Sequence, residues 1–269
     1  MSDESMWVMR TEPAPRWKRV RGSLVVGARN RVSEPAARRL PLSLLRRGHR
    51  LRRRLRPSRY TDADPFTLLD VSPERITRSV ISSATRPPQW GRVVGGDWDR
   101  IREPFDERAV PRGIEQRFVE GRSWRETALF DAYVDQLERF GNAWGHTSLS
   151  GFERRCDAVE RLYESMRAEG YKRQRELDGN VPGTLSGRLD EIHVDIGRDG
   201  ELCWRSYGQH RLAIAKLLGL DTVPVFVHRR HRRWQVVRDD VRESRARENV
   251  ERANRSHPDL RELFAEAPT

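Results

Sequence analysis

Cysteine is scarce in this chain of 269 residues, which contains only Cys156 and Cys203. Two distant cysteines form neither the paired spacing of a zinc site nor the dense, even set of a disulfide framework. Cys156 lies on the apolar face of a helix predicted over 152–169, so we interpret it as a core residue. The sequence therefore predicts a protein of a reducing compartment, and we expect the cytoplasm.

Long hydrophobic runs are also missing. The apolar stretch Leu24–Val26 is far shorter than the roughly 20 residues that a membrane-spanning helix needs. Acidic residues at positions 3 and 4 stand where a secretory signal would carry a basic segment followed by an apolar one. We therefore expect neither a transmembrane segment nor a secretory signal, and nothing in the sequence fixes an oligomeric state.

Acidic residues are rare only in the first part of the chain. Residues 1–60 contain 17 Lys and Arg against 4 Asp and Glu, whereas the remainder contains 35 against 36. The net charge of +12 therefore belongs to an N-terminal arm. The rest of the chain is close to neutral and lacks the overall basic surface of a nucleic-acid domain.

Arginines dominate the end of this arm, with eight of them between Arg46 and Arg59. Such a run repels itself, so the arm at 1–60 is expected to be disordered or weakly helical. It could neutralise nucleic-acid phosphates or an anionic membrane, and the alternatives are a solvated tail or an upstream extension from a misassigned start. The candidate nucleic-acid contacts, including a second basic patch after 227, are Arg46, Arg47, Arg52, Arg53, Arg54, Arg229, Arg230, Arg232 and Arg233.

The ordered part is predicted to be an α+β domain over 61–238, followed by a C-terminal helical tail over 239–269. Apolar spacings predict a strand at 66–71, helices from 111 to about 140, and a helix over 152–169 that ends at Gly170. The sequence from 191 to 205 predicts a β-hairpin around Gly197–Gly200. A helix over 209–218 and a strand over 222–227 follow.

The central motif is Gly208-Gln-His-Arg211, between the hairpin and the helix over 209–218. A helix N-terminus has unsatisfied N–H groups and a partial positive charge, which favour an anion such as phosphate. His210 and Arg211 lie in the first turn, where stability alone would favour acidic residues. The motif therefore predicts an anion site, and the alternative is an ordinary surface helix with incidental basic residues.

This order of elements resembles the ParB/sulfiredoxin superfamily. The similar parts are the helix end at Gly170, the following Gln174, the hairpin, the Gly208–Arg211 box, the Leu218-Gly219 helix end and the Val223-Pro-Val225 strand. Together they cover roughly residues 64–80 and 152–228. The resemblance implies a small mixed sheet with packed helices, and makes the helical block at about 111–150 an insertion.

The resemblance also implies a nucleotide site, because ParB-type boxes bind the triphosphate of CTP and sulfiredoxin boxes bind ATP. By position it places Gln174, Gly208, Gln209, His210 and Arg211 at the phosphates, with Mg²⁺ expected alongside ATP or CTP. Gln209 stands where sulfiredoxins have their catalytic cysteine, and an amide cannot replace that nucleophile. No helix-turn-helix pattern follows the domain, which argues against a full chromosome-partitioning role.

Catalysis would need further groups. His210 and Arg211 are candidates, and Asp97 and Asp99 flank Trp98 in a glycine-rich loop where they could hold Mg²⁺ or act as a base. The alternative for this loop is a turn with Asp caps. The metal ligands of any site remain unknown from sequence.

Three functions stay open at this point. One is a nucleotide-binding NTPase or phosphotransferase. Another is a nucleic-acid-binding protein or nuclease that uses the basic arm. The last is a non-catalytic scaffold or anion-binding module of the ParB-like class.

Overall fold

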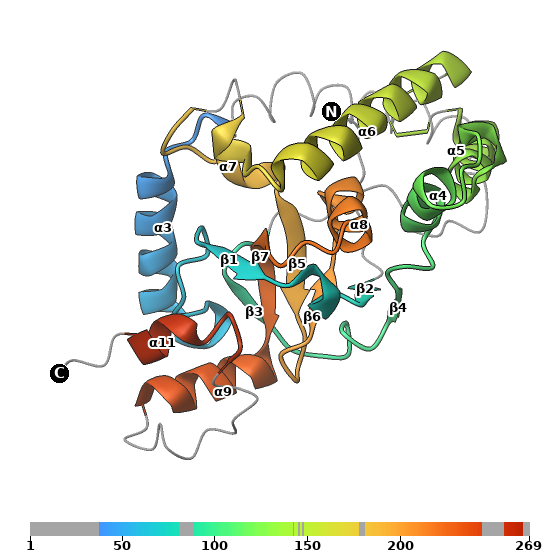
Figure 1. The fold of residues 1–269 in the computed structure, drawn as a ribbon. Helices are drawn as coiled ribbons and strands as arrows, with labels where there is room; N and C mark the ends of the chain where they lie inside the picture. Colours follow the sequence, from blue (N-terminus) through green and yellow to red (C-terminus); the bar gives the residue numbers. More distant parts are fainter. Residues whose placement is uncertain are drawn as a thin grey trace.

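The computed structural model describes residues 38–80, 89–141, 143–144, 146, 148–177, 181–243 and 256–265. At its centre is a seven-stranded mixed sheet with the order β1-β7-β5-β6-β2-β4, and β3 pairs with β7 beyond the end of β1 (Figure 1). The strands are β1 (Leu68–Val71), β2 (Arg78–Val80), β3 (Arg92–Val94), β4 (Arg102–Pro104), β5 (Ile192–Ile196), β6 (Leu202–Trp204) and β7 (Val223–His231). The prediction of an α+β fold with a mixed sheet is confirmed.

One face of the sheet carries the main core. The side chains of Ile192, Val194 and Ile196 alternate along β5 toward this face, where they pack with apolar residues of the helices. These helices are α4 (Ala109–Phe118), α5 (Ala128–Phe140), α6 (Leu149–Glu169) and α8 (Gln209–Leu217). The helices α4 and α5 correspond to the block that the sequence predicted as an insertion.

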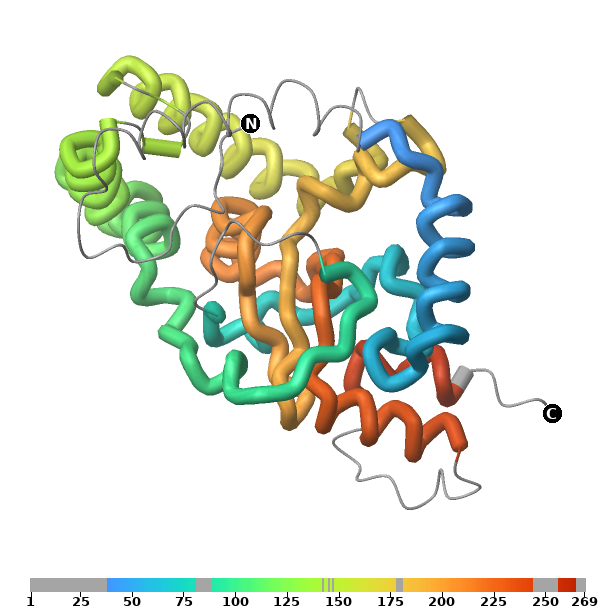
Figure 2. Tube along the Cα trace, turned by 180° about the vertical axis from the view of Figure 1, so that it is seen from behind, coloured from blue at the N-terminus to red at the C-terminus, as the bar shows by residue number. Residues whose placement is uncertain are grey.

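The opposite face is more polar. His193 points to this side because it alternates with Ile192 and Val194 along β5, and its ring packs against Phe226 of β7. Figure 2, seen from behind, shows the segment that contains β3 and β4 running across this side of the sheet. A smaller core of Leu42, Phe66, Leu185 and Phe226 lies here, next to the short helix α7 (Ser186–Leu189).

The prediction that the arm at 1–60 is disordered or weakly helical is wrong for the part from residue 38 onward, which folds onto the domain. Residues Leu42–Leu55 form the helix α3, followed by a 3₁₀ turn over Pro57–Arg59. The helix folds onto the domain because Leu42 and His49 are buried and because Arg46 and Arg53 find the carboxylates of Asp64 and Asp239. Residues 1–37 lie outside the described part.

The predicted domain boundary at 238/239 is also wrong. Strand β7 continues through the basic residues to His231, and α9 (Arg232–Glu243) crosses the boundary. After 244–255, which lie outside the described residues, the chain returns with the helix α11 (Arg261–Ala265). The returning segment buries Asp259 against Arg230 and Arg238, so it belongs to the domain and is no separate tail.

Gly170 ends α6 with a positive φ, as predicted, and Gly141 ends α5 in the same way. Ser123 and Glu126 form a capping box that opens a 3₁₀ turn, and α5 begins after it with Thr127 as its cap. None of the helices in the described ranges is both long and apolar enough to cross a membrane.

Candidate functional site

Gly208 makes the turn from β6 into α8. It has φ 76° and ψ 18°, in the left-handed region. A Cβ atom at this position would lie 2.7 Å from the Cα atom of Ile192 in β5. Glycine is required here for both reasons, since only a residue without a side chain allows this conformation and this close approach.

Helix α8 begins directly at this turn. The first intrahelical bond runs from the N–H of Leu212 to the carbonyl of Gly208, and no side chain caps the helix. The first turn holds Gln209, His210 and Arg211, all buried, and no acidic residue. An α-helix has no intrahelical acceptor for the amides of its first turn, so the start of α8 attracts negative charge.

Arg211 is occupied by a buried carboxylate. Its Nη1 lies 3.3 Å from Oε2 of Glu191, a fully buried residue at the start of β5. The guanidinium also lies 4.1 Å from the ring centroid of Tyr171, and Nη2 donates to the carbonyl of Lys172. Arg211 therefore holds the chain after α6 against α8, and its contact with phosphate stays a prediction.

Glu191 receives two further hydrogen bonds. The hydroxyl of Tyr171 donates to Oε2 at 2.9 Å, and the main-chain N–H of Gln174 donates to Oε1 at 2.8 Å. Burial raises the pKa of Glu191, and these bonds together with Arg211 act in the opposite direction. The side-chain amide of Gln174 donates to the carbonyl of Asp190 at 3.3 Å. Gln174 thus lies near Arg211, as the resemblance implied, but both residues converge on Glu191.

A second cation lies beside the start of α8. Nη2 of Arg155, in α6, is 3.4 Å from Nδ1 of His210. Arginine can only donate, so Nδ1 of His210 accepts in this arrangement. The Arg155 guanidinium also lies 5.7 Å from the ring centroid of Trp144. Burial lowers the pKa of His146, and the charges of Arg155 and Arg154 act in the same direction.

Asp97 and Asp99 do not reach this site. Both accept hydrogen bonds from Nη2 of Arg198 at 2.7 Å, and Oδ2 of Asp99 also accepts from the main chain of Arg198 at 2.9 Å. Burial alone would raise the pKa of Asp99, but these bonds hold it well below its ordinary value. The two carboxylates fasten their loop to the hairpin turn, which is the structural alternative considered from sequence.

Their position rules out a shared centre with Gly208. Arg198 lies just beyond the last residue of β5, while Gly208 contacts Ile192 at the first residue of that strand. The first and last residues of this five-residue strand lie roughly 13 Å apart. Moreover, no group of three or more His, Cys, Asp or Glu in the described ranges could hold a metal ion.

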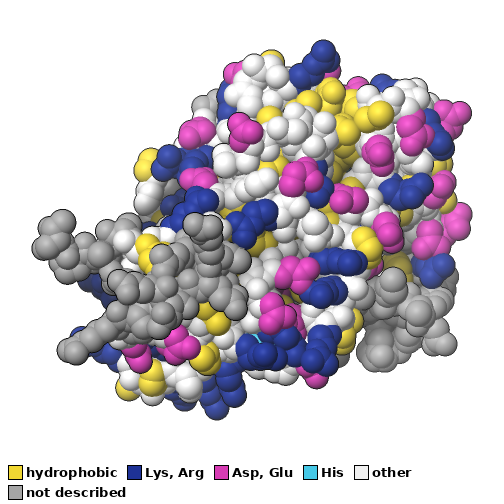
Figure 3. Space-filling view, turned by 60° about the horizontal axis from the view of Figure 1, so that its bottom comes forward, with side chains coloured by type: hydrophobic (Ala, Val, Ile, Leu, Met, Phe, Trp, Pro, Cys, Tyr) yellow, Lys and Arg dark blue, Asp and Glu magenta, His cyan; other side chains and the backbone are white. Residues whose placement is uncertain are grey.

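The nine predicted nucleic-acid arginines fall into two sets. Arg46, Arg53, Arg229 and Arg230 turn inward to Asp64, Asp239, Asp195 and Asp259. They are unavailable to phosphate because buried or half-buried carboxylates neutralise them. The remaining five, Arg47, Arg52, Arg54, Arg232 and Arg233, are exposed. On the face shown in Figure 3, basic and acidic side chains are interspersed, with no single broad basic surface.

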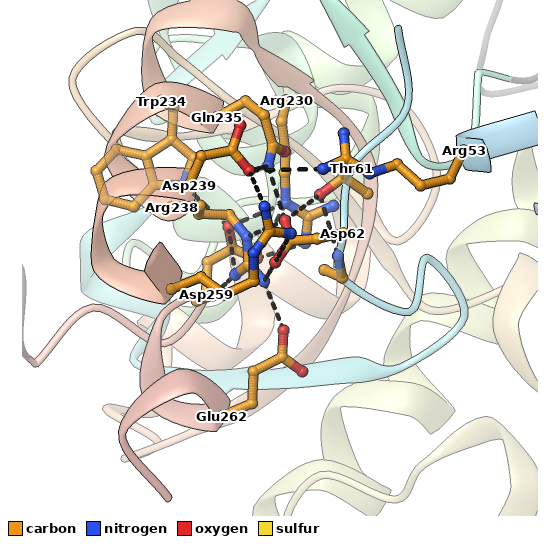
Figure 4. Close-up of polar contacts among 12 residues, drawn as sticks. Arg53, Thr61, Asp62, Arg230, Trp234, Gln235, Arg238, Asp239, Asp259 and Glu262 are labelled. Carbon is orange, nitrogen blue, oxygen red and sulfur yellow. Dashed lines mark hydrogen bonds and ion pairs between the residues drawn. The ribbon is translucent and has the colours of Figure 1, made fainter. Parts of the chain in front are cut away.

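The pair Arg230 and Asp259 belongs to a larger buried network (Figure 4). Arg238 has no exposed surface and contacts the carboxylates of Asp62, Asp259 and Glu262. Asp259 also accepts from Nε1 of Trp234 at 2.9 Å, and its two arginines help to lower its pKa to about 2 against the effect of burial. This network ties α9 and the C-terminal segment to β7, and it joins α9 to Asp62 near the start of the domain.

A similar charge cluster lies on the polar face of the sheet. Asp195 is fully buried between Arg205 and Arg229, at 2.9 and 2.8 Å, and Nδ1 of His228 lies 3.5 Å from its other oxygen. The arginines keep the pKa of Asp195 low although burial would raise it.

Sequence reasoning missed Glu191, Tyr171 and Arg155. The signal for Glu191 was an acidic residue directly before the first apolar residue of a strand. Arg155 gave no signal, because it is one of several arginines on α6. Comparison of the chain with protein-family models, curated proteins and solved structures finds no match.

Proposed function

We propose that this protein binds the phosphate group of a nucleotide or of another phosphorylated ligand at the start of α8. The observation that carries the proposal is the meeting of three features: the N-terminus of α8, the imidazole of His210 in its first turn, and the guanidinium of Arg155 from α6. Helix N-termini that lack an acidic first turn favour anions, and a charged side chain from another element adds a directed donor.

The placement of Arg155 and His210 supports an anion site. Nη2 of Arg155 lies 3.4 Å from Nδ1 of His210 at the start of α8, so both side chains could face one phosphate. A phosphate between them would let both side chains donate, and it would receive the amides of the α8 turn as well. Gly208 supports this arrangement because its backbone approaches β5 without a side chain in the way.

The resemblance of the Gly208–Arg211 box to ParB/sulfiredoxin domains supports the same ligand class, and it makes ATP or CTP with Mg²⁺ the first ligands to try. We restrict the proposal to binding. The carboxylates predicted for catalysis, Asp97 and Asp99, are bound by Arg198 at the far end of β5. An NTPase or phosphotransferase reaction would need other groups to activate water or hold the metal.

Calorimetric titration with ATP, CTP, ADP and inorganic tripolyphosphate, each with and without Mg²⁺, tests the proposal. Arg155→Gln should weaken binding by about tenfold, because it removes a charge-assisted hydrogen bond worth roughly 1.5–3 kcal/mol. His210→Gln should weaken it as well. Arg161→Gln, an exposed arginine elsewhere on α6, is the matched control and should bind as the unaltered protein does.

Arg211 is unsuitable as the probe, because its removal would leave the buried carboxylate of Glu191 without its cation. Absence of binding at millimolar ligand, or binding that is equal in the Arg155 and Arg161 variants, would overturn the proposal. Phosphate release from the bound nucleotide, measured in the same samples, separates an NTPase from a binding module.

A further inference from the structure

Helix α3 lies along one edge of the domain, as both the front and the rear views show (Figures 1 and 2). One side of the helix faces the protein. Leu42 and His49 are buried there, and Arg46 and Arg53 form ion pairs with Asp64 and Asp239. These inner residues account for the packing of α3 on the domain, whereas the residues on its outer side make no such contacts with any residue that the structure describes.

The outer side carries an apolar stripe. Leu44, Leu51 and Leu55 are 57%, 58% and 72% exposed. At 3.6 residues per turn their directions fall within about 40° of one another, so the three side chains line up over roughly 16 Å of helix. Gly48 falls in the same stripe, and a Cβ atom there would meet nothing within 4 Å. Large exposed leucines in a row are costly in water unless they serve contact with another apolar phase.

Arginines border this stripe on both sides. Arg47 and Arg54 are displaced from it by about 60–80° on one side, and Arg52 by about 80° on the other. All of them are exposed, and no carboxylate pairs with them in the part of the chain that the structure describes. The sequence contains no acidic residue at all between Glu34 and Asp62. The outer side of α3 is therefore uniformly positive around an apolar centre.

This combination selects one kind of partner. A helix that only faces water carries acidic residues to pair with its basic ones. A nucleic acid would use the arginines but would gain nothing from aligned leucines. An anionic bilayer uses both, since leucines enter the boundary between headgroups and acyl chains while arginines contact lipid phosphates.

We propose that α3 docks lengthwise on the surface of an anionic phospholipid bilayer. Leu44, Leu51 and Leu55 insert into the interface, and Arg47, Arg52 and Arg54 contact the lipid phosphates. The arginine-rich residues 1–37, which precede α3 in sequence, add positive charge to the same part of the chain. This surface is separate from the start of α8, and the proposal does not depend on ligand binding there.

Flotation of the full-length protein with vesicles tests the docking. One set of vesicles is pure phosphatidylcholine, and the other contains one quarter phosphatidylglycerol. We expect flotation only with the anionic set and a decline as salt is raised. The triple variant Leu44→Ser, Leu51→Ser, Leu55→Ser should lose at least tenfold in partitioning. Arg47→Gln with Arg54→Gln should lose about fivefold for each arginine removed.

A double variant at exposed apolar residues outside α3, Ile101→Ser with Val119→Ser, is the matched control. It should float like the unaltered protein, and thermal unfolding checks that all variants fold. No flotation of the unaltered protein with anionic vesicles would overturn the proposal. A leucine variant that floats normally would also overturn it. The same holds if duplex DNA displaces the protein from vesicles and the leucine variant still binds that DNA with full affinity, because DNA would then use the arginines alone.

Discussion

Arg211 and Glu191 form a buried ion pair, with Nη1 of the arginine 3.3 Å from Oε2 of the glutamate. Arg211 comes from the first turn of α8 and Glu191 from the start of β5. Tyr171 and the main chain of Gln174 complete the contacts of the carboxylate. The pair therefore joins the segment after α6 to the sheet and to the helix at whose start we propose that phosphate binds.

Removing one member of this pair should cost more than removing both. Arg211→Met leaves Glu191 buried without its cation, and we expect the free energy of unfolding to fall by about 3 kcal/mol. The double variant Arg211→Met, Glu191→Gln should recover part of that loss. Urea unfolding of the single and double variants measures this coupling. Equal losses in the two proteins would show that the pair is not the source of the stability.

The close approach at Gly208 predicts a different cost at two glycines. Gly208→Ala places a Cβ atom 2.7 Å from Ile192, whereas Gly219 has a similar φ of 62° with nothing within 4 Å. Both variants suffer from the positive φ, but only the first is also overpacked. We expect Gly208→Ala to lose about 2 kcal/mol more than Gly219→Ala in urea unfolding. Similar losses would contradict the close packing of the turn on β5.

Asp259 should matter far more than its neighbour Glu262. Asp259→Ala leaves Arg230 and Arg238 buried without their shared carboxylate, and we expect a loss of about 4 kcal/mol. Glu262 also contacts Arg238, but its side chain is 44% exposed, so Glu262→Ala should cost less than about 1 kcal/mol. Chemical denaturation of both variants at neutral pH is the measurement.

Mild acid should destabilise the fold through His257. Burial is the largest cause that lowers the pKa of His257 from its ordinary value of 6.5 to about 4. The folded protein therefore keeps this imidazole neutral where the unfolded chain would protonate it. The stability from this group is complete above pH 6.5 and is lost progressively as the pH falls to about 4, by roughly 3 kcal/mol.

The variant His257→Gln should flatten this part of the pH profile. Nε2 of His257 lies 2.8 Å from the carbonyl of Gly200, a bond that a glutamine amide could donate instead. Urea unfolding from pH 7.5 to 4.5 compares the two proteins. An unchanged slope in the variant would assign the acid sensitivity to other groups, such as the buried His193.

The loop of Asp97 and Asp99 should affect stability and leave ligand binding alone. Asp99→Ala removes the acceptor of several hydrogen bonds from Arg198 and should lower the melting temperature, whereas Asp97, which is exposed, should matter less. Neither change should alter nucleotide affinity in the calorimetric titrations. A large loss of affinity in Asp99→Ala with the melting temperature unchanged would restore its predicted role at the site.

What the sequence predicted well depends on neighbours in the chain. Gly170 and Gly208 mark a helix end and a turn through their own backbone, and the hairpin around Gly197–Gly200 needs only local pairing. Contacts between distant residues were missed. Glu191 meets Arg211 across 20 positions and Arg155 meets His210 across 55, so no local pattern could join them.

The same limit explains the errors about charge. Arg229 and Arg230 look like a basic surface patch until Asp195 and Asp259, 34 and 29 positions away, neutralise them in the folded chain. The arginine run from Arg46 to Arg59 looked unable to fold because it contains no acidic residue, but Asp64 and Asp239 supply carboxylates to the inner side of α3.

The burial of Asp259 also has a consequence for the order of events during synthesis. The ribosome releases β7 and α9, with Arg230 and Arg238, before it has added the carboxylate that both of them need. We expect nascent chains that stop before residue 256 to remain sensitive to protease and to become resistant once the following segment emerges. Translation would then deliver the central strand of the sheet ahead of the counter-charge that fixes it in place.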